Sequence, residues 1–266
     1  QRLAESWLVY LDISLPHRGT ADLLDVLADA EGKIAKDHLE LPAFSLTSGQ
    51  PSLINGSKDF CDWTRKDTEM AAKLEEHAGA VLGPYAKGLV TLGLAESRLE
   101  KGGDDYQVLE LINRGLMENL DGGKFELQYV GACLLARYYL LTGHMADCRK
   151  TLSEIEEKAR QRGARRIVQN IHALNCRVLL WAGRVGDATL WMEQEPPEEV
   201  RFNVLERYRY NTRIRVYLAQ QRYDKAALLL ERLRSYANME NRPWLQMESN
   251  ILGAIIRRRV GDEVWK

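Results

Sequence analysis

The sequence predicts an all-α protein, a superhelical solenoid of tetratricopeptide-like helix pairs that recur about every 40 residues. Three observations predict this fold class. A turn motif recurs along the chain, apolar residues between the turns follow helical spacing, and no segment alternates polar and apolar residues long enough to form a strand.

The turn motif is a helix that runs into a glycine. The marked turn positions are 143, 183, 221 and 261, so the spacings are 40, 38 and 40 residues, and an earlier copy ends at Gly102. Glycine accepts the left-handed backbone conformation that ends many helices, and Gln221 takes this place in one copy. Because tetratricopeptide repeats usually span about 34 residues, each helix here is expected to gain roughly one turn.

Small residues recur at fixed distances from each turn. Five residues after it stand Cys148, Ala188 and Ala226, and seven residues before it stand Ala95, Ala136, Cys176 and Ala254, whereas Ile214 departs from this pattern. Small side chains at both places let two antiparallel helices cross closely, so this pattern indicates tetratricopeptide packing.

The first third of the chain is less regular. Residues 2–12 and 21–37 read as two helices, and Thr20 is the expected N-cap of the second, which carries Leu23, Leu27, Ala30 and Ile34 on one face. Residues 41–66 contain Pro42, Gly49, Pro51 and Gly56 and predict a long loop, either functional or packed on the surface. Helix resumes near Thr68. We therefore expect an irregular part over 1–66 and helical repeats over 67–266, joined in one continuous solenoid.

Composition excludes several functions. The formal net charge of the 266 residues is −1, so the chain as a whole has no electrostatic reason to bind nucleic acid. No run of about 18 apolar residues exists, so no membrane span is expected, and the cytoplasm is the default compartment. The four widely spaced cysteines, Cys61, Cys133, Cys148 and Cys176, read as reduced and structural.

Chemistry-bearing motifs are missing from the sequence. The five histidines share no metal-ligand spacing, no phosphate-binding G-x-x-x-x-G-K-[ST] loop occurs, and no nucleophile stands beside a candidate base. The expectation is a binding protein that is not an enzyme and holds no cofactor or metal.

A solenoid recognises ligands on the inner wall formed by the first helix of each pair. The wall position six residues before each turn gives Glu96, Arg137, Arg177, Arg215 and Ile255, so three successive repeats stack an arginine there. The neighbouring rows give Leu92, Cys133, Ala173, Asn211 and Ile251, then Leu89, Val130, Asn170, Tyr208 and Glu248, with Trp181 on the rim. Guanidinium groups match carboxylate, phosphate and hydroxyl acceptors, and aromatic rings stack on ligands.

Two readings of this wall stay open. In the first, Arg137, Arg177, Arg215, Asn170, Asn211, Tyr208 and Trp181 line a pocket for a small polar or anionic inducer. In the second, each arginine pairs with a neighbouring glutamate or carbonyl and only stabilises helix stacking. A third possibility concerns the ligand: the groove of such a scaffold can instead hold a partner protein or peptide.

The repeats also resemble a known family. Leu141 to Cys148, Trp181 to Trp191, the Glu-Pro-Pro-Glu linker at 195–198 and Tyr217 to Leu233 are similar to the helical sensor domain of MalT-like transcriptional activators of the LuxR class, which are built on signal-transduction ATPases. Residues 49–60 also look like a segment of some of these regulators. The resemblance runs from Tyr129 to Gly261.

This resemblance implies a role in transcription regulation. In that family the sensor lies between an ATPase module and a helix-turn-helix domain, and a small-molecule inducer promotes self-association and DNA binding. Since the chain starts abruptly with Gln1 and contains neither neighbour, it reads as an isolated sensor fragment that does not itself contact DNA.

Overall fold

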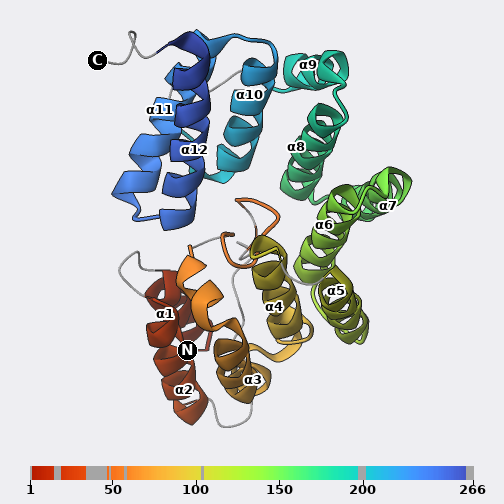
Figure 1. Ribbon diagram of the computed structural model, residues 1–266. Coiled ribbons are helices and arrows are strands. Elements are labelled where there is room, and N and C mark those ends of the chain that lie inside the picture. The colour runs from red at the N-terminus through yellow and green to blue at the C-terminus, as the bar shows by residue number, and fades with distance from the viewer. Residues whose placement is uncertain are drawn as a thin grey trace. The chain divides into compact units, whose positions relative to one another are not determined.

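The computed structural model describes residues 2–14, 19–33, 47, 49–56, 59–102, 105–196 and 202–261. Within these ranges the chain forms twelve α-helices and three short 3-10 helices, with no strand (Figure 1). The all-α, tetratricopeptide-like fold class predicted from the sequence is therefore confirmed.

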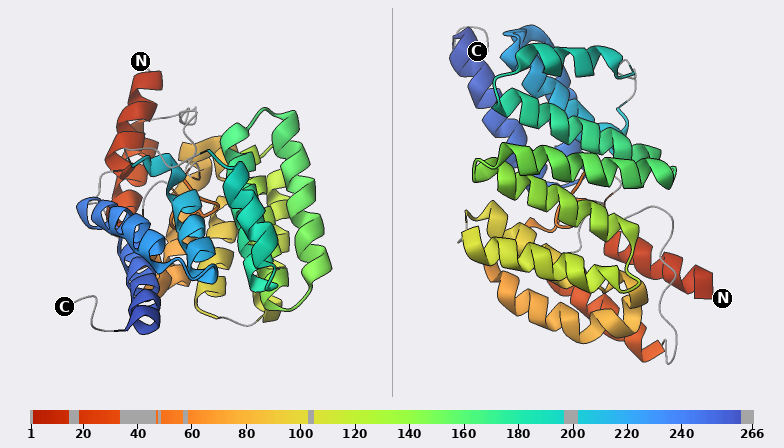
Figure 2. Two further views of the ribbon diagram at one scale, coloured as in Figure 1. Left: turned by 90° about the horizontal axis from the view of Figure 1, so that it is seen from above. Right: turned by 90° about the vertical axis from the view of Figure 1, so that its right-hand side faces the viewer.

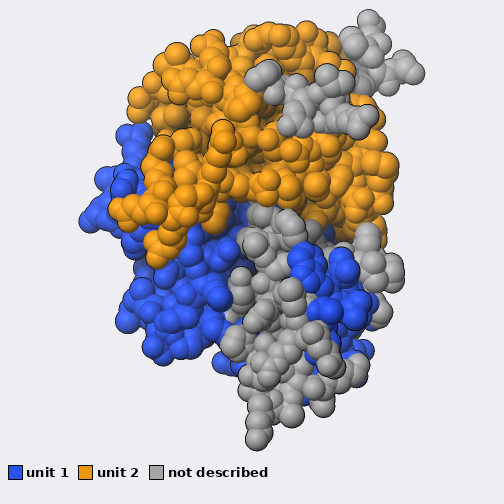
Figure 3. Space-filling view, turned by 180° about the vertical axis from the view of Figure 1, so that it is seen from behind, with its two compact units in different colours: residues 1–158 blue, residues 159–266 orange. Residues whose placement is uncertain are grey.

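The chain forms two compact units, residues 1–158 and 159–266, which divide within α7 (Figure 3). The sequence-based division at residue 66 stays a prediction. Unit 1 holds α1 (Arg2–Ser14), α2 (Thr20–Lys33), η1 (Cys61–Lys66), α3 (Asp67–Leu82), η2 (Gly83–Tyr85), α4 (Leu89–Glu100), α5 (Asp105–Leu120), α6 (Phe125–Leu141) and most of α7 (Met145–Gln161). Unit 2 holds α8 (Arg165–Trp181), α9 (Val185–Gln194), η3 (Val204–Glu206), α10 (Arg207–Ala219), α11 (Tyr223–Met239) and α12 (Pro243–Val260).

Successive helices pack as antiparallel pairs within each unit (Figure 2). In unit 2, α8 packs against its return helix α9 and also against α10, the first helix of the next pair. In unit 1, α4 packs in the same way against α5 and α6. This double packing, in which first helices of neighbouring pairs touch, is the arrangement that stacks tetratricopeptide repeats.

The residues at the predicted turns all have a positive φ. The backbone angle φ is +67° at Gly102, +81° at Gly143, +71° at Gly183, +61° at Gln221 and +88° at Gly261. After three of them the next residue donates its N–H to the carbonyl five residues back, from His144 to Tyr139, Arg184 to Leu179 and Arg222 to Tyr217, at 2.8–2.9 Å. These bonds satisfy carbonyls at the helix end, and the pattern is the same in these three copies.

The small residues after each turn lie where the sequence predicts. Cys148, Ala188 and Ala226 are fully buried, and so are Ala95, Ala136 and Cys176 on the helices before the turns. The Cys176 Sγ atom lies 3.9 Å from the carbonyl oxygen of Ala188, which shows how closely α8 and α9 approach. Burial raises the pKa of the Cys176 thiol to about 12, as expected for a packing residue.

Ala254 differs from the other small residues before a turn. Ala254, the small residue seven before Gly261, is exposed, whereas its neighbours Leu252, Gly253 and Ile256 are buried. The physical reason is that this position faces the return helix of its own pair, and no described helix follows α12.

The N-terminal elements match their predictions with small shifts. Leu27 and Ala30 of α2 are buried in a core with Trp63, Met70 and Leu74, while Ile34 lies outside the described residues. The predicted N-cap Thr20 is instead the first helical residue of α2. Gly19 precedes it and donates its N–H to the Asp22 carboxylate at 2.9 Å, as in one half of a capping box.

Candidate functional site

In unit 2, the arginines six residues before each turn form contacts with residues of neighbouring helices. From α8, Arg177 donates through Nε to Thr212 Oγ1 at 2.9 Å and through Nη2 to Asn211 Oδ1 at 3.1 Å, both on α10. Its guanidinium carbon also lies 4.1 Å from the centre of the Tyr208 ring. The hydrogen bonds hold the Arg177 guanidinium within its plane, and the Tyr208 ring packs against its face, so the orientation of the side chain is fixed.

Glu248 on α12 interacts with arginines from two other helices. Arg215 Nη2 donates to Glu248 Oε1 at 2.6 Å, and Arg177 Nη1 lies 3.8 Å from the same oxygen. Arg215 Nε also donates to Asn211 Oδ1 at 3.1 Å. Arg177, Tyr208, Asn211, Arg215 and Glu248 thus form one network over α8, α10 and α12, which we call the polar cluster.

The polar cluster is only partly open to solvent. The side chains of Arg177 and Glu248 are 21% and 20% exposed, and that of Arg215 is 35% exposed. Tyr208 and Asn211 are buried beneath them, and the Nδ2 donor of Asn211 has no acceptor among the described residues. A buried donor without a partner costs about 1–3 kcal/mol, so the cluster holds unused hydrogen-bonding capacity.

Burial corrects the expectation that three rows line an open wall. Cys133, Ala173, Asn170, Tyr208 and Asn211 are all buried, because neighbouring first helices pack together through these rows. Only the arginine row and Glu248 retain solvent exposure in the middle of the series. Of the predicted ligand residues, Tyr208 and Asn211 therefore lie beneath the arginines, and Asn170 is buried as well.

Three of the predicted residues are not part of the polar cluster, and one of them, Asn170, is buried on α8. Arg137 on α6 belongs to unit 1, where its Nη2 is bonded to the Glu100 carboxylate of α4. Trp181, in the last turn of α8, is 64% exposed. Glu248 was missing from the predicted ligand residues although its row was identified, because a sequence pattern does not show which charges will meet.

In unit 1 the first position of the row six residues before each turn is a glutamate, and its carboxylate accepts hydrogen bonds from a segment earlier in the same unit. Glu96 on α4 is 1% exposed and accepts hydrogen bonds from Ser52 Oγ at 2.5 Å and from the N–H groups of Leu53 and Ile54 at 2.7 and 3.2 Å. Ile54 and Asn55 are themselves buried. Of the loop predicted at 41–66, residues 52–54 are therefore packed against α4, whereas Asp62, Arg65 and Lys66 are exposed.

The variant Glu96→Gln removes the ionisable group, so the pH dependence of its stability tests whether the Glu96 carboxyl group is buried. Burial raises the pKa of Glu96, although its hydrogen bond from Ser52 lowers it in part. A carboxyl group with a raised folded-state pKa contributes stability that is complete below its ordinary value of 4.5 and lost as the pH rises through the folded value. Urea unfolding should therefore show wild type gaining stability relative to Glu96→Gln between pH 7 and pH 5. Equal changes in both proteins would contradict the burial of an ionisable group here.

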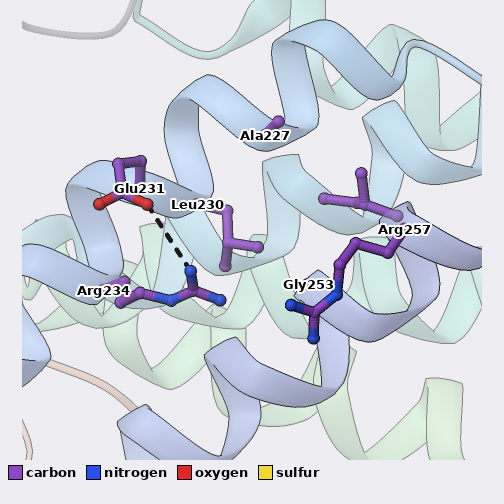
Figure 4. Close-up of a pocket in the computed structure, with 7 residues that line it drawn as sticks. Ala227, Leu230, Glu231, Arg234, Gly253 and Arg257 are labelled. Atoms are coloured by element: carbon purple, nitrogen blue, oxygen red, sulfur yellow. Dashed lines mark ion pairs between the residues drawn. The ribbon is translucent and has the colours of Figure 1, made fainter. Parts of the chain in front are cut away.

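Two of the hollows among the described residues have no predicted ligand residue in their walls. One, of about 220 Å³, lies in unit 1 between α5, α6 and α7, with Leu116, Leu120, Ala132, Leu135 and Ile155 among its walls. The other lies in unit 2 between α11 and α12 (Figure 4). Within the described ranges no group of three or more His, Cys, Asp or Glu residues is placed to hold a metal ion, and no helix there is long and apolar enough to cross a membrane.

Comparison with known proteins places the repeats in a family. Searches of curated proteins and of solved structures return no match. The family model of the MalT-like TPR region matches residues 121–264, which include α6 to α12 and the whole polar cluster. Because this match covers more than half of the 266 residues, the chain belongs to the MalT-like TPR region family.

Proposed function

We propose that this chain is the ligand-sensing region of a MalT-type transcription regulator and that its ligand is a small polar or anionic inducer. The observation that supports the proposal is the polar cluster, which displays two guanidinium groups and one carboxylate over a buried aromatic ring. In this proposal the chain works in the cytoplasm beside an ATPase and a helix-turn-helix domain. Inducer binding promotes self-association, and the helix-turn-helix domain makes the contacts with DNA.

The composition of the polar cluster restricts its ligand. Arg177 and Arg215 offer donors, whereas Glu248 offers an acceptor and repels dense negative charge. A ligand with both hydroxyl donors and oxygen acceptors, or with a single negative charge, fits this set best. We expect binding without catalysis, since the cluster contains no nucleophile beside a base.

The same contacts suggest how binding is transmitted. Arg177 and Arg215 join α8 and α10 to α12 through Glu248, so a ligand that takes over some of these bonds changes the helix-to-helix contacts. Because each repeat touches mainly its neighbours, a change between adjacent first helices alters their angle. This change is the proposed signal to the adjoining domains.

Calorimetry with an arginine variant tests the proposal. A thermal-shift panel of oligosaccharides, sugar phosphates and small carboxylates first identifies a stabilising compound, since a ligand of the folded state raises the melting temperature. Arg177→Ala should then bind that compound at least about tenfold more weakly, because a charge-assisted hydrogen bond is lost. Arg166→Ala removes an exposed arginine from the same helix and should leave affinity unchanged. Full affinity in Arg177→Ala would refute the assignment of the site.

A second function is favoured by the hollow in unit 1. Its walls are mostly apolar, and the nearby Met117 and Leu120 are 66% and 65% exposed, as expected of a surface that holds an apolar partner segment. In this alternative the chain is a scaffold for a partner protein or peptide. Leu120→Asp would then abolish partner binding while Arg177→Ala would not affect it, the opposite of the result expected for an inducer sensor.

A further inference from the structure

A turn that precedes η1 is held on α4 by one carboxylate. Three donors of this turn converge on Glu96: the Ser52 hydroxyl at 2.5 Å, and the N–H groups of Leu53 and Ile54 at 2.7 and 3.2 Å. The Ser52 hydroxyl oxygen also accepts a hydrogen bond from the N–H group of Asn55 at 2.8 Å, which closes the turn. A hydroxyl and two adjacent N–H groups that point at one carboxylate form a concave donor set of the kind that binds anions in proteins.

The segment that contains this turn, residues 49–56, is named the strap, and it is bound as a peptide ligand would be. Glu96 stands six residues before its turn, at the place that Arg177 and Arg215 hold in unit 2. Those two arginines bond to the next first helix, whereas Glu96 bonds to a segment that belongs to no helix pair. Since solenoids recognise ligands through their first helices, the strap occupies a position suited to a ligand.

Stability alone does not account for a carboxylate at this position. Glu96 is 1% exposed, and burial raises its pKa, so holding its charge in the protein is unfavourable. A well-packed apolar side chain in place of a buried charge is often neutral or stabilising. A carboxylate instead provides selectivity, because it requires donors placed as those of the strap are. The contact therefore has the character of recognition.

A neighbouring charge pair compensates Glu96 when the strap leaves. Glu100 lies one turn further along α4, and its carboxylate bonds to Nη2 of Arg137 on α6. Against the effect of burial, the charge of Arg137 lowers the pKa of Glu96, so the guanidinium acts on both carboxylates. Because an uncompensated buried charge is strongly destabilising, this arginine makes displacement of the strap feasible.

We propose that this part of α4 is a peptide-binding site and that the strap occupies it as an autoinhibitory contact. The partner is a protein segment with the donors of the strap, namely a serine or threonine hydroxyl followed by two free N–H groups. It also carries an apolar side chain in the place of Ile54, which is buried. The site is distinct from the polar cluster and from the hollow between α5, α6 and α7, because Glu96 belongs to neither.

A full-length variant with a released strap tests the proposal. Ser52→Ala combined with Leu53→Pro removes two of the three donors to Glu96. The probe is a fluorescein-labelled, end-capped peptide of residues 49–56, followed by anisotropy. We expect saturable binding to this variant, and binding at least about tenfold weaker to wild type, where the strap competes at an effective concentration in the millimolar range.

Further changes assign the binding to Glu96. Adding Glu96→Gln to the strap variant, or Ser52→Ala to the peptide, should weaken binding by about tenfold, because a charge-assisted hydrogen bond is lost. Adding Glu110→Gln, which alters an exposed glutamate of α5, should leave the affinity unchanged. No saturable binding to the strap variant, or full affinity after Glu96→Gln, would overturn the proposal.

Wild type tests release of the strap without any change to its sequence. Unlabelled peptide at millimolar concentration should displace the strap, so that the N–H groups of Leu53 and Ile54 lose protection from hydrogen exchange while those of α4 keep theirs. The peptide with Ser52→Ala should have a much smaller effect. Unchanged protection of Leu53 and Ile54 would mean that the strap is a fixed part of the fold. Loss of the helical circular dichroism signal in the strap variant would lead to the same conclusion, and either result would contradict the proposal.

Discussion

Replacing Ala226 by leucine should destabilise unit 2 by about 3 kcal/mol. Ala226 follows the turn at Gln221 by five residues and is fully buried in a core with Ile214, Leu229, Leu230 and Leu233. The larger side chain would have to enter the place where α10 and α11 pack together, so the helices must separate or the side chains must leave their preferred rotamers. Chemical denaturation followed by circular dichroism measures the loss.

Leu228→Ala supplies the matched control for this prediction. Leu228 lies on the same helix but is 71% exposed, so its truncation should change the free energy of unfolding by less than about 0.5 kcal/mol. Equal stability of Ala226→Leu and wild type would contradict the idea that small residues at this position hold the helix pairs together.

Replacing Glu248 by alanine should cost about 2 kcal/mol of stability and also alter ligand binding. The substitution leaves Arg177 and Arg215, both partly buried, without the carboxylate that they share. The guanidinium groups of Arg177 on α8 and Arg215 on α10 then repel each other, and Arg215 loses its shortest hydrogen bond. Thermal and urea unfolding should both show the loss.

Two further variants separate charge from shape at this position. Glu248→Gln keeps an acceptor oxygen, so it should lose less stability than Glu248→Ala. Glu193→Ala removes an exposed carboxylate from α9 in the same unit and should have almost no effect. If Glu248→Ala were as stable as wild type, the polar cluster would not hold the three helices together, and the proposed signal would lose its basis.

The parts of the fold predicted from the sequence are those that repeat. Left-handed turns and close helix crossings each require a particular kind of residue, so glycine and alanine recur at their positions and reveal the period. Gln221, which has a left-handed backbone although it is not glycine, shows that the period was a better guide than residue type. The arginine row was predicted by the same reasoning and does bring Arg177 and Arg215 to one network.

Features that depend on contacts between distant residues could not be predicted in this way. The packing of Ser52 and Leu53 on Glu96 joins residues more than 40 positions apart, and no periodic signal records it. Burial of Asn170 and Asn211 also depends on how closely first helices approach, which polar side chains give no reason to expect. Glu248 completes the polar cluster for the same reason: its partners come from two other helices.

The central claim is that the polar cluster on α8, α10 and α12 receives the inducer. The most direct test is an NMR titration that follows the side-chain Nε–H signals of the arginines while the stabilising compound from the thermal-shift panel is added. We predict that the signals of Arg177 and Arg215 shift together and saturate with the calorimetric affinity, while that of exposed Arg166 stays in place. Saturation of the calorimetric signal with no movement of Arg177 or Arg215 would contradict the claim.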